Sequence, residues 1–143
     1  MKPKIRKIKE EDFKKGFLET LFNLAPVKLT SPKAEKIYKK YIKNNPVYHV
    51  FVAELENQIV GAITLLIEQK FIHQGGKVGH IEDVVARTGF EGRGIGSALV
   101  KTAIKKAKEQ HCYRVILDCC QKNIPFYKKF GFYQHETEMR LDL

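Results

Sequence analysis

The order of apolar and polar positions along the first third of the chain predicts one short strand followed by two helices. Residues 4–8 have strand character, and residues 12–25 carry apolar side chains at helical spacing until Pro26 stops the run. Ser31 is the expected N-cap of a second helix, with Pro32 in its first turn and Asn44-Asn45-Pro46 after its end.

The middle of the chain predicts a β-hairpin. Residues 48–55 and 58–69 are rich in β-branched and aromatic side chains, and only Glu56-Asn57 separates them. A turn at residues 74–77 follows, so the hairpin leads into further strands.

The remaining pattern predicts a βαβ unit and then a short helix and a strand. A strand at 80–86, a glycine-bearing loop at 88–96, a helix to about Gln110 and a strand at 113–118 imply a right-handed parallel crossover. The expected inward side of that helix is Ile95, Ala98, Leu99, Thr102 and Ala103. Residues 123–130 follow as a short helix closed by Gly131, and residues 133–143 as a last strand. The predicted fold class is α/β, with a mixed, mostly antiparallel central sheet flanked by helices.

Length and composition are consistent with one domain over residues 1–143. The chain has 143 residues, of which 43% are hydrophobic, and no linker or repeat interrupts it. Its start has no apolar signal core and its longest apolar run is too short to cross a bilayer, so we expect a cytoplasmic protein. Cys112, Cys119 and Cys120 have no zinc-site spacing with the histidines, and we expect no metal. A nucleophilic cysteine with a distant histidine partner stays open as an alternative.

The formal net charge of +10 leaves three interpretations: a nucleic-acid binder, an enzyme for anionic small molecules, or ordinary solvation by lysine. Lys101, Lys105 and Lys108 recur on the polar side of one predicted helix, as on a solvent-exposed face. No nucleic-acid-binding motif accompanies the charge, so we expect no nucleic-acid partner.

The segment from Glu91 to Ser97 (Glu-Gly-Arg-Gly-Ile-Gly-Ser) joins a predicted strand to a predicted helix, where backbone N–H groups can bind a phosphate. It lacks the Lys-Ser/Thr of a P-loop. It has Ser97 where a dinucleotide-binding fingerprint has glycine, although Asp118 lies at a suitable distance downstream. A tight turn without a ligand is the remaining alternative.

Together with the segment Asn-Ile-Pro-Phe-Tyr-Lys-Lys-Phe-Gly-Phe at 123–132, this loop and its flanking elements resemble the GNAT superfamily of N-acetyltransferases over residues 50–135. The resemblance implies acetyl-CoA as cosubstrate, with the loop amides at its pyrophosphate and its pantetheine along an exposed strand. The implied coenzyme contacts are Val84, Val85, Ala86, Gly92, Arg93, Gly94, Ile95, Gly96, Ser97, Asn123 and Tyr127. Glu91 stands where the superfamily usually has Arg or Gln, and we expect weaker coenzyme affinity from it.

Three further segments resemble the glucosamine-6-phosphate N-acetyltransferase family: Lys-Phe-Ile-His at 70–73, Gly-His-Ile-Glu-Asp-Val-Val at 79–85, and Cys-Tyr-Arg-Val-Ile-Leu-Asp-Cys at 112–119. This family makes the N-acetylated precursor of UDP-N-acetylglucosamine. The resemblance implies sugar-phosphate contacts from Lys70, Phe71, Ile72, His73, Glu82, Asp83, Val84, Tyr113 and Arg114. Alternating strand faces imply that Glu82 and Asp83 do not share one pocket.

The implied reaction is direct acetyl transfer, in which the neutral amine attacks the thioester and a backbone N–H stabilises the oxyanion. The catalytic residues implied are Tyr127 at the departing thiolate, Glu82 as acceptor of the amine proton, and Asp118 as an orienting group. Taken singly, each of these residues also fits an ordinary surface or core position.

Family resemblance also implies a homodimer in which the last strand reaches the partner. Ala25 and Asp142 stand where a sugar-contacting threonine and a phosphate-binding arginine are expected. Two alternatives remain open at this point: an acetyltransferase for protein amino termini, lysines or polyamines, and a coenzyme A-binding regulatory module without catalysis.

Overall fold

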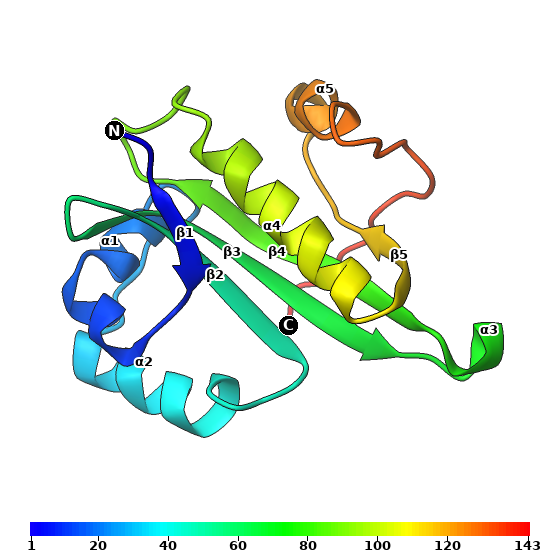
Figure 1. Ribbon diagram of the computed structural model, residues 1–143, viewed down its shortest axis with the longest axis horizontal. Helices are drawn as coiled ribbons and strands as arrows, with labels where there is room; N and C mark the ends of the chain where they lie inside the picture. Colours follow the sequence, from blue (N-terminus) through cyan, green and yellow to red (C-terminus); the bar gives the residue numbers. More distant parts are fainter.

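The computed structural model describes all residues, 1–143, and its centre is a mixed sheet of five strands in the order β1-β2-β3-β4-β5 (Figure 1). The strands are β1 (Lys4–Lys7), β2 (Tyr48–Leu55), β3 (Gln58–Gln69), β4 (Lys77–Ala86) and β5 (Cys112–Ile116). The first four pair antiparallel, and β4 pairs parallel with β5. The expected mixed, mostly antiparallel sheet is therefore confirmed.

The hairpin β2–β3 has the predicted bounds, and its turn shows why. Glu56 and Asn57 both have positive φ angles, of 48° and 62°. This is the conformation of a two-residue turn whose twist matches that of the strands. Asparagine tolerates this conformation, whereas glutamate adopts it only because the pairing of β2 with β3 holds it there.

The first predicted helix is broken in the structure. A 3₁₀-helix, η1 (Glu10–Lys14), is followed by α1 (Phe17–Leu21), and Gly16 between them has a φ of 90°. A Cβ at Gly16 would lie 2.7 Å from Nη1 of Arg87. The left-handed conformation of Gly16 interrupts the helix at a point where the Arg87 side chain packs against it, and the second helical segment ends well before Pro26.

The second helix consists of α2 (Ser31–Ile37) and a π-helical turn, η2 (Tyr38–Ile42). Its N-cap is Thr30, not Ser31, because the Thr30 hydroxyl accepts a hydrogen bond from the Lys33 N–H. The Ser31 hydroxyl instead donates to the Phe13 carbonyl oxygen, 2.8 Å away. That bond attaches α2 to η1.

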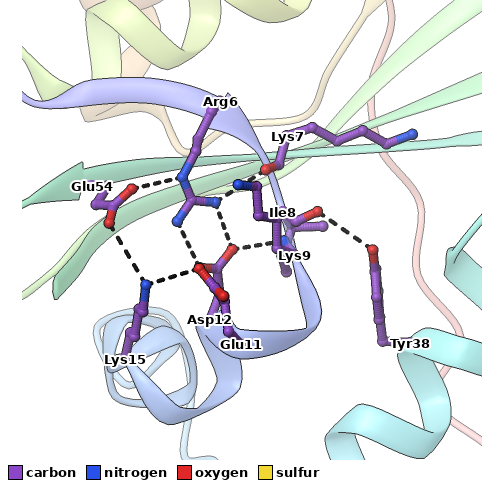
Figure 2. Close-up of polar contacts among 9 residues, drawn as sticks. All are labelled: Arg6, Lys7, Ile8, Lys9, Glu11, Asp12, Lys15, Tyr38 and Glu54. Atoms are coloured by element: carbon purple, nitrogen blue, oxygen red, sulfur yellow. Dashed lines mark hydrogen bonds and ion pairs between the residues drawn. The ribbon is translucent and has the colours of Figure 1, made fainter. Parts of the chain in front are cut away.

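A cluster of charged side chains joins β1, η1 and β2 (Figure 2). Asp12 is fully buried and receives two hydrogen bonds from Arg6, of 2.8 and 2.7 Å, and one of 2.7 Å from the Lys9 N–H. Arg6 Nε also donates to Glu54, at 2.6 Å. These bonds raise the pKa of Arg6, first through Asp12, so the guanidinium stays charged. The cluster fastens the amino-terminal segment to the sheet.

Helices cover both faces of the sheet. The crossover helix α4 (Ile95–Glu109) lies on one face, with Ile95, Leu99, Val100, Ala103 and Ala107 buried. Ala98 and Thr102, expected inward, are only half-buried. The segments η1, α1 and α2 pack on residues of β2 and β3 in a second core.

Gly61 on β3 determines how closely α4 approaches the sheet. A Cβ there would clash with Cγ2 of Ile95 and lie 3.1 Å from Cδ1 of Leu99. The helix can rest at this distance only because the strand has no side chain at that position.

The carboxyl-terminal part contains η3 (Gln121–Asn123) and α5 (Ile124–Lys128), followed by Gly131 with a φ of 95°. The strand expected at 133–143 is wrong for the single chain, because these residues form neither helix nor strand. Tyr133, Met139 and Leu141 are 78%, 93% and 84% exposed. A strand needs a paired edge and an apolar surface to cover, and the tail finds neither within its own chain.

Candidate active site

An open pocket of about 730 Å³ lies between β4, β5, α5 and the carboxyl-terminal tail. Its lining includes Glu82, Tyr113, Arg114, Asp118 and Tyr127. The three expected catalytic residues are thus brought to one cavity, together with two of the expected sugar-phosphate residues. They come from segments up to 45 positions apart in the sequence.

The pocket exists because β4 and β5 separate. Their pairing begins at Lys77 and ends at His80 opposite Ile116, so residues 81–86 of β4 have no strand partner on that side, where only the Ala86 carbonyl accepts a side-chain hydrogen bond, from Asn23. Unpaired backbone groups at a strand edge can pair with an extended ligand as with another strand. Val84, Val85 and Ala86, the expected pantetheine contacts, lie on this open stretch.

A β-bulge interrupts β4 beside the catalytic candidates. The register with β3 shifts between Ala62 and Thr64, and Asp83 has a φ of 51°. The strict alternation assumed from the sequence is broken here. Glu82 lines the pocket and Asp83 does not, although both side chains are exposed.

Glu82 lies among other acids. Although the residue is exposed as a whole, partial desolvation of its carboxyl group raises the pKa of that group, and Asp83, Asp118 and Glu138 raise it further. A carboxyl whose ionised form is disfavoured takes up a proton more readily than a solvent-exposed one. Glu82 therefore has the chemistry of a proton acceptor at this pocket.

The glycine loop before α4 presents unused hydrogen-bond donors. None of the hydrogen bonds within the protein uses an N–H group of residues 92–97. Gly92 and Gly94 have φ angles of 73° and 78°, and a Cβ at either would meet no atom within 4 Å. Because no side chain covers the backbone at these two glycines, an anion can approach the N–H groups there and the positive end of α4.

Both charged side chains of this loop are engaged with neighbours. The guanidinium of Arg93 lies 4.9 Å from the centre of the Phe90 ring. The two carboxylate oxygens of Glu91 accept hydrogen bonds from Asn23 Nδ2, at 3.0 Å, and from the Gly89 N–H, at 2.7 Å. Backbone N–H groups of Glu91 itself and of Gly89 lower the pKa of this carboxyl, so it is ionised. The sequence predicted that Glu91 weakens the affinity for the coenzyme, and it gave no sign that Asn23 is the hydrogen-bond partner of Glu91.

Tyr127 connects the pocket to the glycine loop. Its ring is half-buried and packs edge-on against Phe126, whose ring tip would lie 3.4 Å from a Cβ at Gly96. Its hydroxyl has no hydrogen-bond partner in the protein. Burial raises the pKa of this hydroxyl most, and the neighbouring Cys119 and Cys120 raise it further. The protonated phenol is therefore available to donate to a group in the pocket. Asn123, at the start of α5, also has no side-chain hydrogen bond.

Lys70, one of the expected phosphate residues, lies in an ion-pair group with Glu68 and His80 near the start of β4. His80 lines the pocket, whereas Lys70 and His73 do not. Lys70 pairs with Glu68 at 2.9 Å, and His80 contacts the other oxygen of Glu68 at 2.8 Å. Lys70 and, second, His80 lower the pKa of the Glu68 carboxyl. Glu68 and His80 were not among the expected residues, although His80 lies two positions before Glu82 and so on the same side of a regular strand.

Aromatic stacking joins the loop after β3 to β5. The His73 ring lies 4.4 Å from that of Tyr113, and the Arg114 guanidinium lies 5.5 Å from the same ring. This brings three of the expected residues together. Phe71 and Ile72 do not join them: Ile72 begins the short turn α3 (Ile72–Gly75), and both side chains are exposed and lie outside the pocket lining.

The rest of the chain offers few competing sites. No group of three or more His, Cys, Asp or Glu side chains is placed to hold a metal ion. All three cysteines are free thiols, with Cys119 and Cys120 exposed. None of the helices has the length and apolar character needed to cross a bilayer.

Comparison with known proteins agrees with this geometry. The model of the Acetyltransferase (GNAT) family matches residues 5–132, which include the glycine loop and all of the sheet except Lys4. A crystal structure of glucosamine-6-phosphate N-acetyltransferase from Arabidopsis thaliana superimposes with a TM-score of 0.94 at 32% identity, covering 99% of both chains.

Two relatives named glucosamine 6-phosphate N-acetyltransferase are similar in sequence. The Candida albicans protein is 38% identical over 94% of this chain and 91% of its own length. The Trypanosoma brucei brucei protein is 46% identical over 66% of this chain and 64% of its own length. On this likeness over nearly its full length, and on the family match across the sheet and loop, the chain belongs to the glucosamine 6-phosphate N-acetyltransferase family of GNAT acetyltransferases.

Proposed function

We propose that the protein transfers the acetyl group of acetyl-CoA to the 2-amino group of glucosamine 6-phosphate. The observation that carries this proposal is one pocket that joins Glu82, Asp118 and Tyr127, next to a glycine loop with unused N–H donors. The product is N-acetylglucosamine 6-phosphate, a precursor on the route to UDP-N-acetylglucosamine. Residues 1–143 act as one catalytic domain.

The residues present fit coenzyme A. The N–H groups of residues 92–97 would hold its diphosphate, with Arg93 and the positive end of α4 adding favourable charge. The open edge of β4 at 84–86 would pair with its amide-bearing arm, and Asn123 would contact it from α5. When bound, acetyl-CoA supplies the acetyl group as a reactive thioester.

The catalytic groups divide proton transfer between them. Glu82 accepts the proton that the sugar amine gives up, directly or through a water, since its carboxyl has a raised affinity for protons. The Tyr127 hydroxyl donates to the sulfur that leaves with coenzyme A. Asp118 orients the amine from the opposite wall of the pocket.

The cationic side chains beside the pocket are suited to a phosphate dianion. Arg114 lines the pocket, and Lys70, which is paired with Glu68, lies outside its lining; both supply positive charge. His73 supplies a further hydrogen-bonding group and stacks on the Tyr113 ring, which also lies beside Arg114. Phe71 and Ile72 extend this side, while Asp83 and Val84 complete the sugar contacts from β4.

We further propose that the protein works in the cytoplasm as a homodimer. The exposed apolar side chains of residues 133–143 gain a surface and a strand partner if the tail pairs with a second copy. That copy would also approach the exposed Phe71 and Ile72. A molar mass of one chain at assay concentration, measured by light scattering, would contradict the dimer.

A thiol-release assay with acetyl-CoA tests the function directly. The acceptor panel contains glucosamine 6-phosphate, glucosamine, spermidine and a lysine peptide. We expect rapid release only with glucosamine 6-phosphate, because only this acceptor combines the amine with a phosphate. Preference for spermidine or the peptide would reject the proposed acceptor, and no release with any of them would reject the enzyme.

A further inference from the structure

His80 has a central position among the polar side chains of the pocket. It lies on β4 opposite Ile116 of β5, and two positions before Glu82. On β5, Arg114 comes two positions before Ile116, and Asp118 follows two positions after it, just beyond the end of the strand. Side chains two positions apart in a strand share one face, and His80, Glu82, Arg114 and Asp118 all line the pocket. His80 is therefore flanked by Arg114 on one side and by the two acids on the other.

This order puts His80 between the two ends of the proposed acceptor. Glu82 and Asp118 are the groups proposed at the amine, and Arg114 is proposed at the phosphate. A sugar phosphate that reaches both ends must pass His80. In glucosamine 6-phosphate, the carbons C3 and C4, each with a hydroxyl, lie between the amine-bearing C2 and the C6 that carries the phosphate. His80 is thus placed to meet a ring hydroxyl.

Glu68 determines which hydrogen-bonding groups the ring of His80 can offer. Nε2 of His80 lies 2.8 Å from Oε1 of Glu68, and an ionised carboxylate only accepts hydrogen bonds, so Nε2 carries the proton. In the neutral imidazole, Nδ1 then has the free lone pair, and it has no hydrogen-bond partner in the protein. The other oxygen of Glu68 pairs with Lys70 at 2.9 Å, which holds the carboxylate in place. The ring therefore has an unused acceptor for a hydroxyl.

We propose that His80 is a specificity-determining residue, whose Nδ1 accepts a hydrogen bond from the C3 or the C4 hydroxyl of the sugar, with Glu68 as its positioning residue. This rests on the proposed function, because it takes glucosamine 6-phosphate as the occupant of the pocket. The hydroxyl does not react, so the bond stabilises the bound sugar and the transition state equally. Its loss raises the KM for the sugar and leaves the turnover number unchanged.

Deoxy analogues of the acceptor test this bond. The thiol-release assay measures kcat/KM for glucosamine 6-phosphate and for its 3-deoxy and 4-deoxy analogues. We expect the wild-type protein to use one of the two analogues about tenfold less well than the parent sugar, the size that one hydrogen bond supports. His80→Phe keeps a ring without nitrogen, so the KM for the parent sugar should rise about tenfold and the discrimination against that analogue should disappear. The KM for acetyl-CoA should not change.

Further variants separate the hydrogen bond from the shape of the side chain. His80→Gln keeps a hydrogen-bonding group and should retain part of the discrimination. Glu68→Ala releases the ring and should lower the discrimination severalfold. The ratio between parent and analogue does not depend on the freed Lys70, because these sugars carry the same phosphate. His111→Asn is the control for the loss of a histidine, since His111 is exposed, lies outside the pocket lining, and has a φ of 59° that asparagine tolerates.

The outcomes distinguish this inference from the function on which it rests. Rapid release with glucosamine 6-phosphate but equal use of both analogues by the wild-type protein overturns the inference, and so does full discrimination in His80→Phe. A variant His80→Gln that behaves like His80→Phe shows that the shape of the ring, and not its nitrogen, is responsible, and also overturns it. Absence of thiol release with glucosamine 6-phosphate overturns the proposed function instead.

Discussion

The charged cluster at β1 and the glycine loop before α4 differ in how many of their polar groups are hydrogen-bonded within the protein. At the cluster, the buried carboxylate of Asp12 accepts hydrogen bonds from Arg6 and from the Lys9 N–H. At the loop, a run of N–H groups is left without acceptors. The first arrangement contributes to folding and the second can contribute only when a ligand arrives. Damage to the cluster should therefore reduce stability, and damage to the loop should reduce binding.

The largest effect is expected from Asp12→Ala. The change leaves the Arg6 guanidinium partly buried with one carboxylate instead of two, and breaking such a pair costs about 3–5 kcal/mol. Urea unfolding should show this loss, while KM values of the folded fraction stay unchanged. Glu11→Ala, which removes an exposed partner of Lys15, is the control and should change stability little.

Tyr127→Phe should affect turnover next most strongly. The hydroxyl has no partner in the protein, so its removal leaves the fold intact and takes away the proton donor. We expect turnover to fall by about a hundredfold, with KM values nearly constant. Tyr41→Phe, on an exposed part of η2, serves as control. An unchanged turnover number would remove Tyr127 from the reaction.

Gly94→Ala should weaken coenzyme binding. A Cβ strains a residue whose φ is 78° by about 1–2 kcal/mol, so the loop shifts and the KM for acetyl-CoA rises about tenfold. Gly89→Ala offers a close match, because its φ is 87° and it also faces open space, but it lies outside residues 92–97. If both variants raise this KM equally, strain in general and not the donors would be the cause.

Lys70→Ala should act on the acceptor alone. It removes a positive charge that lies beside the pocket and is paired with Glu68, so we expect the KM for glucosamine 6-phosphate to rise severalfold, with that for acetyl-CoA unchanged. His73→Ala should show the same selectivity. Lys101→Ala on the solvent-exposed side of α4 is the control for net charge. Equal losses for both substrates would contradict this placement of the phosphate.

The smallest effect should come from Glu82→Gln on stability. Partial burial and then Asp83 and Asp118 raise the pKa of Glu82 above 4.5. Its stabilising contribution is therefore present at low pH and lost as pH rises through the folded-state pKa. The glutamine variant should unfold at slightly higher urea than the wild type at pH 7, but not at pH 4. A variant less stable than wild type at pH 7 would contradict this sign.

Local sequence was sufficient where local contacts determine the structure. The hairpin β2–β3 has its predicted bounds because two runs rich in β-branched and aromatic residues are separated by only Glu56 and Asn57. The glycine loop and α4 were also placed correctly, since Gly92, Gly94 and the apolar stripe of the helix give short-range signals.

Long-range contacts explain what the sequence missed. At the helix break, Gly16 lies against the side chain of Arg87, and Glu91 has its side-chain partner in Asn23, 68 positions away. The bulge at Asp83 arises from pairing with β3 and overrides alternation. The tail at 133–143 has strand character, but strand formation needs a partner surface that its own chain does not provide.

The lack of a side chain at Gly61 affects the position of the proposed coenzyme site. Ile95, which touches it, is the first residue of α4, and the donors of residues 92–97 are attached to that same helical end. A methyl group on β3 would push this end outward and carry the donors with it. If residues 92–97 hold the diphosphate as proposed, the absence of one carbon atom on β3 sets the distance from that site to the pocket with Glu82 and Tyr127.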